Sequence, residues 1–162
     1  MIDFATHEKW MKYALEEAQK AFELDETPVG AVIVREGRIV GRGFNRVETF
    51  KDPTAHAEII AIGAATQESG YERLDNTVIY VTLEPCPMCA GAIVLARIPM
   101  LVYGAVDPKT GACGSLYNIC NDERLNHYVN VIPGILEHEC SDILKNFFRS
   151  LRERKRTGGT PV

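Results

Sequence analysis

An alternation of strand and helix segments in the second half of the chain constrains its fold more than any other feature. An apolar, β-rich segment at 77–83 precedes a segment at 87–97 that is rich in Ala, Ile, Val and Leu and has the composition of a helix. A second strand segment follows at 100–105, and another is predicted at 129–132. This alternation predicts a sheet that is covered by helices.

The first half predicts one helix and then a β-hairpin. Residues 4–23 carry apolar side chains at three- and four-residue intervals, the spacing of an amphipathic helix. Strands at 29–34 and 38–44 are separated by Arg35-Glu36-Gly37, where Gly37 can supply the positive φ of a tight antiparallel turn. Further helices are predicted at 54–67, at 115–120 (a short one) and from 135 to about 156. The sequence therefore predicts an α/β fold with a five-stranded mixed sheet and helices on both faces.

Length and composition fit one ordinary globular domain. The chain has 162 residues, of which 46% are hydrophobic and 25% are charged. We expect a single domain over 1–156 and a disordered tail over 157–162. The start of the chain lacks a basic segment followed by an apolar one, and no run reaches the roughly 18 apolar residues of a membrane span. A cytoplasmic location without membrane contact is therefore expected.

The charge distribution is uneven along the chain. A formal net charge of −4 provides no overall attraction for a nucleic acid. The segment 145–156, however, holds six basic residues and one acidic residue, Glu153, a local charge of +5. Such a basic helix end either binds a polyanion or is a solvated face that complements the helix dipole.

Cysteines supply the first indication of chemistry. Five cysteines without an export signal favour free thiols or metal ligands over disulfides. Cys86 and Cys89 are three residues apart at the start of a predicted helix, where the helix dipole favours thiolate and both sulfurs can turn toward one ion. Taken alone, this Cys-x-x-Cys has two common alternative interpretations, a redox pair or half of a four-ligand structural zinc site.

His56 changes that interpretation. One His and two Cys fill three positions of a tetrahedral site and leave the fourth for water, which is the pattern of catalytic zinc. Cys113, Cys120 and Cys140 have no partner at ligand spacing and are interpreted as small buried residues. Glu58 is either a helix-start carboxylate or a general acid/base. Helical geometry alone cannot assign it, because positions two apart in a regular helix point about 200° apart.

A resemblance to a known family extends this interpretation. His56-Ala57-Glu58 followed by Pro85-Cys86-Pro87-Met88-Cys89 resembles the signature of the cytidine deaminase superfamily, H-x-E then P-C-x-x-C. Nearly the whole chain resembles the bacterial tRNA-specific adenosine deaminases, in the segments 28–32, 43–46, 52–59, 81–86, 88–92, 104–105 and 114–116. The resemblance implies a three-layer α/β/α sandwich, a homodimer and one zinc ion per chain. It also implies hydrolytic conversion of adenosine to inosine at the wobble position of a tRNA, specifically an arginine tRNA with an ACG anticodon.

The resemblance also implies roles for individual residues. His56, Cys86 and Cys89 would hold the zinc, and Glu58 would move protons between water, adenine and the departing amine. The substrate-binding residues it implies are Asn45, Val29, the backbone at Ala57 and Glu84, Asp107, Phe148 and Arg149. Asn45 is alternatively a turn residue and Val29 plain core. Phe147 and Phe148 are adjacent on a helix, so we expect only one of them to contact an anticodon stem-loop.

Two other functions remain open at this point. A related deaminase that acts on a free base or nucleoside, such as guanine or cytosine, would use the same zinc chemistry. The resemblance to wobble-position enzymes and the basic segment at 145–156 argue for the RNA substrate. A non-catalytic, zinc-stabilised RNA-binding module is the third candidate, and the presence of Glu58 argues against it, since a structural site gains nothing from a carboxylate there.

Overall fold

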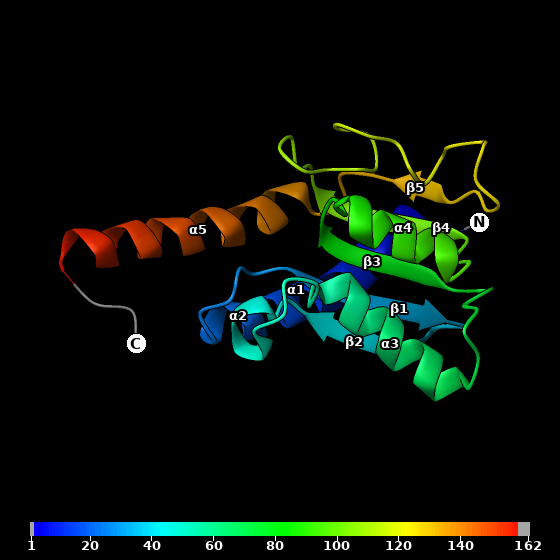
Figure 1. Ribbon diagram of the computed structural model, residues 1–162, viewed down its shortest axis with the longest axis horizontal. Coiled ribbons are helices and arrows are strands. Elements are labelled where there is room, and N and C mark those ends of the chain that lie inside the picture. Colours follow the sequence, from blue (N-terminus) through cyan, green and yellow to red (C-terminus); the bar gives the residue numbers. More distant parts are fainter. Residues whose placement is uncertain (1, 159–162) are drawn as a thin grey trace.

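Five strands form one sheet in the order β2-β1-β3-β4-β5 in the computed structural model, which describes residues 2–158 (Figure 1). β1 (Gly30–Arg35) pairs antiparallel with β2 (Arg38–Phe44) and with β3 (Val78–Leu83). β3, β4 (Met100–Ala105) and β5 (Asn130–Ile132) run parallel to one another. The mixed five-stranded sheet predicted from the sequence is confirmed.

The hairpin between β1 and β2 closes as predicted. Gly37 has a φ of +71°, and Glu36 before it also has a positive φ, of 49°. Positive φ at both central residues is characteristic of the turn whose twist matches that of paired strands.

Helices cover both faces of the sheet and complete a three-layer α/β/α sandwich. α3 (Ala57–Ser69) and α4 (Pro87–Leu95) pack on one face, against the core that includes Ile33, Ile79 and Leu101. α1 (Phe4–Glu23) and α5 (Glu137–Arg156) pack on the other face, with Val32 and Tyr80. Because successive strand residues point to opposite faces, a fully buried sheet of this kind requires the continuous apolar runs seen in the sequence.

Two glycines of β2 let α3 approach the hairpin closely. A Cβ at Gly43 would collide with the carbonyl oxygen of Ala57 in the first turn of α3. A Cβ at Gly41 would collide with the carbonyl oxygen of Ala61, one turn further along. The backbone of α3 therefore lies directly on β2, and no side chain fits between them.

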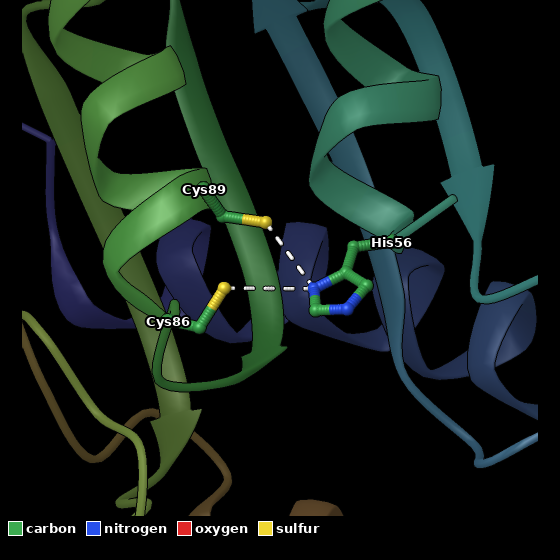
Figure 2. A group of neighbouring side chains, drawn as sticks. All are labelled: His56, Cys86 and Cys89. Carbon is green, nitrogen blue, oxygen red and sulfur yellow. Dashed lines mark hydrogen bonds between the residues drawn. The ribbon is translucent and has the colours of Figure 1, made fainter. Parts of the chain in front are cut away.

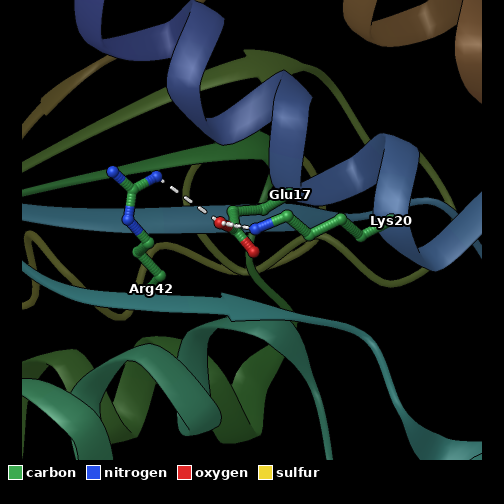
Figure 3. Close-up of polar contacts among 3 residues, drawn as sticks. All are labelled: Glu17, Lys20 and Arg42. Carbon is green, nitrogen blue, oxygen red and sulfur yellow. Dashed lines mark hydrogen bonds and ion pairs between the residues drawn. The ribbon is translucent and has the colours of Figure 1, made fainter.

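A buried carboxylate joins α1 to the same hairpin. Glu17 is almost fully buried, and its Oε1 lies 2.8 Å from Lys20 Nζ and 3.5 Å from an Arg42 guanidinium nitrogen (Figure 3). Both cations are about half exposed, so the pair neutralises the buried charge and still reaches solvent.

Two helix predictions were wrong in ways that have local causes. α3 begins at Ala57, three residues later than predicted, because Asp52 accepts hydrogen bonds from the backbone and side chain of Thr54 and holds that segment in a turn. The short helix predicted at 115–120 is absent. Instead Cys113 pairs with Asn118 in an isolated β-bridge, which uses backbone groups that a helix would need.

The structure adds one short helix to those predicted. A four-residue helix that was not predicted, α2 (Val47–Phe50), follows β2. α5 ends at Arg156, and Thr157, the first residue of the predicted disordered tail, is its C-cap residue. Residues 159–162 of that tail lie outside the described residues. Within the described residues, the helices are too short or too polar to span a membrane.

Candidate active site

The predicted metal ligands come from the starts of two neighbouring helices. His56 is the residue before α3, and Cys86 is the residue before α4; both have extended backbone, with ψ of 154° and 173°. Neither side chain caps its own helix, so both are free to turn toward the space between the helices. Cys89 lies in the first turn of α4, after Pro87, whose fixed φ suits that position.

The three donor atoms converge on one point (Figure 2). His56 Nδ1 lies 3.6 Å from Cys86 Sγ and 3.5 Å from Cys89 Sγ. In a tetrahedral zinc site, bonds of about 2.3 Å to sulfur and about 2.0–2.1 Å to nitrogen place those atoms about 3.5–3.6 Å apart. The group therefore fits zinc. Among residues 2–158 it is also the only cluster of three or more His, Cys, Asp or Glu side chains with donor atoms this close.

The two thiols differ in acidity. A hydrogen bond from Cys89 lowers the pKa of Cys86 to about 4, against the opposing effect of burial. The same hydrogen bond, together with burial, raises the pKa of Cys89. The hydrogen bond with Cys86 also raises the pKa of His56. The lowered pKa favours the thiolate form of Cys86, the form of cysteine that binds metals.

Glu58 lies beside this group without belonging to it. It is in the first turn of α3, only 4% exposed, and is not among the three clustered ligands. Burial raises its pKa, which favours a carboxyl group able to hold a proton. Because His56 precedes the helix instead of lying in it, the 200° separation expected within a regular helix does not apply to the two residues.

A cavity of about 310 Å³ opens beside the ligands. Its walls include six of the residues singled out in the sequence besides His56 and Cys86: Val29, Asn45, Ala57, Glu58, Glu84 and Asp107. Leu83, Val47 and Thr110 add wall area that sequence reasoning missed. The volume is at the small end of ligand sites, which suits one planar base.

Asn45 is a turn residue, which is one of the two interpretations offered for it. Its side-chain nitrogen donates to the Thr27 carbonyl at 3.2 Å, and its side-chain oxygen accepts from the Val47 backbone at 3.3 Å. It is therefore a turn residue that also faces the cavity. Val29 likewise is core, 9% exposed, and cavity wall at once.

Glu84 contributes more than the backbone predicted for it. Its buried carboxylate accepts hydrogen bonds from the backbone of Asp107 (3.1 Å), Cys113 (3.1 Å) and Ser115 (3.0 Å), and from the Ser115 hydroxyl (2.5 Å). The Asp107 side chain is used within its own turn, where it accepts from Lys109 and Thr110. Glu84 thus fixes the loop 107–115 that forms one side of the cavity.

Glu26 holds the opposite side and was not found from the sequence. It is fully buried and accepts hydrogen bonds from the backbone of Glu48 at 3.0 Å and of Thr49 at 2.7 Å. These contacts fix α2 against the cavity, in place of a capping side chain. No local sequence pattern identifies Glu26 as a site residue, because its hydrogen-bond partners are more than twenty residues away.

Phe148 and Arg149 lie outside the cavity. With Leu144, Lys145, Ser141 and Arg152 they line a separate open groove of about 400 Å³ on α5. Phe147 is buried against Phe22, whereas Phe148 is 43% exposed. One ring therefore packs inward and the other faces out.

The remaining cysteines are buried, as predicted. Cys120 and Cys140 are fully buried and Cys113 nearly so, and none joins the metal-ligand group. The sulfurs of Cys113 and Cys120 lie 3.6 Å apart.

Comparison with known proteins places the chain among deaminases. Residues 5–152 match the MafB19-like deaminase family. The tRNA-specific adenosine deaminase of Bacillus subtilis (strain 168) is 49% identical over 149 residues, which cover 92% of each chain. The chain belongs to the tRNA-specific adenosine deaminase family.

Solved structures agree with this assignment. A deaminase structure from work on A-to-I editing at the wobble position of transfer RNA has a TM-score of 0.81 and 47% identity. That match covers 84% of this chain and 99% of the other. A guanine deaminase from Bacillus subtilis is 44% identical with a TM-score of 0.60, over 62% of this chain and 64% of that one. At 47–49% identity over most of the chain, the likeness is to the tRNA-specific adenosine deaminases.

Proposed function

We propose that this chain converts adenosine to inosine at the wobble position of a tRNA anticodon, with an arginine tRNA bearing ACG as the substrate. The observation that carries the proposal is the His56, Cys86 and Cys89 group beside a base-sized cavity and the buried Glu58, in a chain related over 92% of its length to such an enzyme. The reaction consumes water and releases ammonia.

One zinc ion per chain completes the proposed site, held by His56, Cys86 and Cys89. When bound, zinc supplies Lewis acidity that lowers the pKa of a water ligand to about 7. Glu58 takes the proton of the water that attacks C6 of adenine, and delivers it to ring N1. It then carries the proton of the new C6 hydroxyl to the departing amine, so that ammonia leaves as the C6–N bond breaks and the C6=O bond of inosine forms.

The cavity walls orient the base for this attack. Asn45 hydrogen-bonds the adenine with the amide that faces the cavity, and Val29 covers one face of the ring. The backbone at Ala57 and Glu84 lines the remaining edge. Asp107, at the cavity wall, and Phe148 and Arg149, outside the cavity, contact the anticodon loop. We also propose a homodimer in the cytoplasm, as the family resemblance implies.

The test of substrate class compares RNA with small molecules. We expect purified protein to deaminate an anticodon stem-loop carrying ACG, and to act poorly on free adenosine, cytidine and guanine, with products identified by mass. The partial likeness to a guanine deaminase makes guanine the most informative small molecule. Efficient turnover of guanine with none on the stem-loop would replace this proposal with the small-molecule function.

The groove on α5 leads to a prediction about RNA affinity. Arg149 and Arg152 line the groove with the exposed Phe148, whereas Arg154 is already paired with Asp25 at 2.9 Å. Replacing Arg149 and Arg152 with Ala should weaken stem-loop binding. The slope of log affinity against log salt concentration should become shallower by about 0.7 per lost phosphate contact. The measurement is affinity against salt concentration.

Arg73→Ala serves as the control for this experiment, because Arg73 is exposed in the segment that follows α3. If the double variant and the wild type have the same affinity and the same dependence of affinity on salt concentration, the basic end of α5 is only a solvated face.

A further inference from the structure

The guanidinium of Arg46 lies against two aromatic rings at the edge of the site. Its central carbon lies 4.7 Å from the centre of the Phe44 ring and 4.8 Å from the centre of the Phe50 ring. Two cation–π contacts of this kind hold the planar group in one orientation. We call these three side chains the arginine stack.

The arginine stack lacks a counter-charge. Arg38, Arg42, Arg124 and Arg154 each form an ion pair, but Arg46 forms none with the residues that the structure describes. Its Nε is the only buried side-chain nitrogen or oxygen without a hydrogen-bond partner among 2–158. Buried donors are nearly always satisfied, so an oriented and unsatisfied guanidinium indicates a missing anionic partner.

The position of the stack connects it with the cavity. Arg46 lies between Asn45 and Val47, both of which line the cavity, and its backbone donates to the carbonyl of Ala55, next to His56. Phe50 is the last residue of α2. Glu26 holds this helix by accepting hydrogen bonds from the backbone of Glu48 and Thr49. The guanidinium is therefore supported by the same segment that bounds the site.

A second basic surface lies at the same end of the molecule. α2 lies at the end of the sheet toward which α5 projects (Figure 1). Arg154 of α5 pairs with Asp25, and the neighbouring Glu26 holds α2. A polyanion that follows α5 can thus reach the arginine stack without crossing the sheet.

We propose that the arginine stack binds a backbone phosphate of the RNA next to the nucleotide whose base occupies the cavity. The inference rests on the proposed function, which brings an RNA loop to this cavity. A guanidinium binds phosphate through two parallel hydrogen bonds, and the two rings fix its plane before the RNA arrives. A free base has no phosphate, so this contact distinguishes RNA from small molecules.

The test measures binding of a stem-loop that already carries inosine at the wobble position, so that turnover does not interfere. Arg46→Met keeps an unbranched apolar stem beside the rings and removes the charge. It should lower affinity about tenfold or more, as expected for a lost hydrogen bond to a charged group. The slope of log affinity against log salt concentration should also become shallower by about 0.7. Arg46→Lys should restore the salt dependence but only part of the affinity, because an ammonium is a point charge.

Arg38→Met is the matched control, since Arg38 lies at the far end of β2 and pairs with Glu68. Zinc content and circular dichroism should be the same in all four proteins. Equal affinity and equal salt dependence for wild type and Arg46→Met would overturn the inference, as would wild-type protein that binds the stem-loop without salt dependence.

Deamination by the same proteins separates this inference from the proposed function. For Arg46→Met we expect a higher KM for the stem-loop with kcat nearly unchanged, because the phosphate is remote from C6. If wild type binds the stem-loop with the Arg46-dependent slope but does not deaminate it, the proposed function fails and the phosphate contact stands.

Discussion

Glu58→Ala is expected to lower turnover of the anticodon stem-loop by about 10²–10⁴-fold, the usual contribution of a general acid/base. The reason is that Glu58 is buried beside the ligand group without being a member of it, so its loss removes proton transfer and leaves the donor atoms in place. Rates are measured at saturating substrate, and zinc content is determined on the same samples.

Two further variants sharpen this experiment. Glu58→Gln keeps the shape and hydrogen-bonding capacity of the side chain but cannot accept a proton, so it should be nearly as slow as Glu58→Ala. Glu68→Ala, at the other end of α3, removes an exposed carboxylate that pairs with Arg38 and should leave turnover unchanged. Activity of Glu58→Ala within about tenfold of wild type would exclude the role assigned to Glu58.

Cys89→Ala should release the metal and abolish activity. The side chain is fully buried and supplies one of only three protein donors, so its loss leaves zinc with two. Turnover should fall by at least about 10³-fold, because the Lewis acidity of zinc lowers the activation free energy by several kcal/mol. Metal analysis should give one zinc per wild-type chain and almost none for the variant.

Cys113→Ala is the control for the metal experiment, since Cys113 is a buried thiol outside the ligand group. It should keep both zinc and activity. A zinc content near two per wild-type chain, or full zinc in Cys89→Ala, would contradict the assignment of ligands. Stripping zinc with a chelator should also lower the thermal midpoint, because the ion binds only the folded arrangement of ligands that are 30 residues apart in sequence.

Local sequence patterns predicted the strands, the hairpin and the clustering of the three candidate ligands well. The strand at 100–105 has the predicted bounds, and Gly37 supplies the predicted positive φ, because apolar runs and turn chemistry act over a few residues. His56, Cys86 and Cys89 were recognisable for a similar reason: the chemistry of zinc restricts which residue types can cluster.

The supports of the site were not predictable in the same way. Glu26 and Glu84 act on backbone groups 22 to 31 residues away, so only the folded chain shows what they hold. The start of α3 was placed too early because the hydrogen bonds of Asp52 compete with the helix over the same residues. The stack around Arg46 depends on the turn of α2, which is too short to leave a periodic pattern.

The glycines beneath α3 have a consequence for how this enzyme can diversify. Because Gly41 and Gly43 let the helix backbone lie on β2, the depth of Glu58 is set by contact between main chains. Val29 and Val47, by contrast, face the cavity from the segments at either end of the hairpin. Evolution or an engineer can therefore reshape base selectivity at those two positions, whereas any side chain introduced at Gly43 would move Glu58 itself. The hairpin thus holds α3 in one position while the residues that select the base can change.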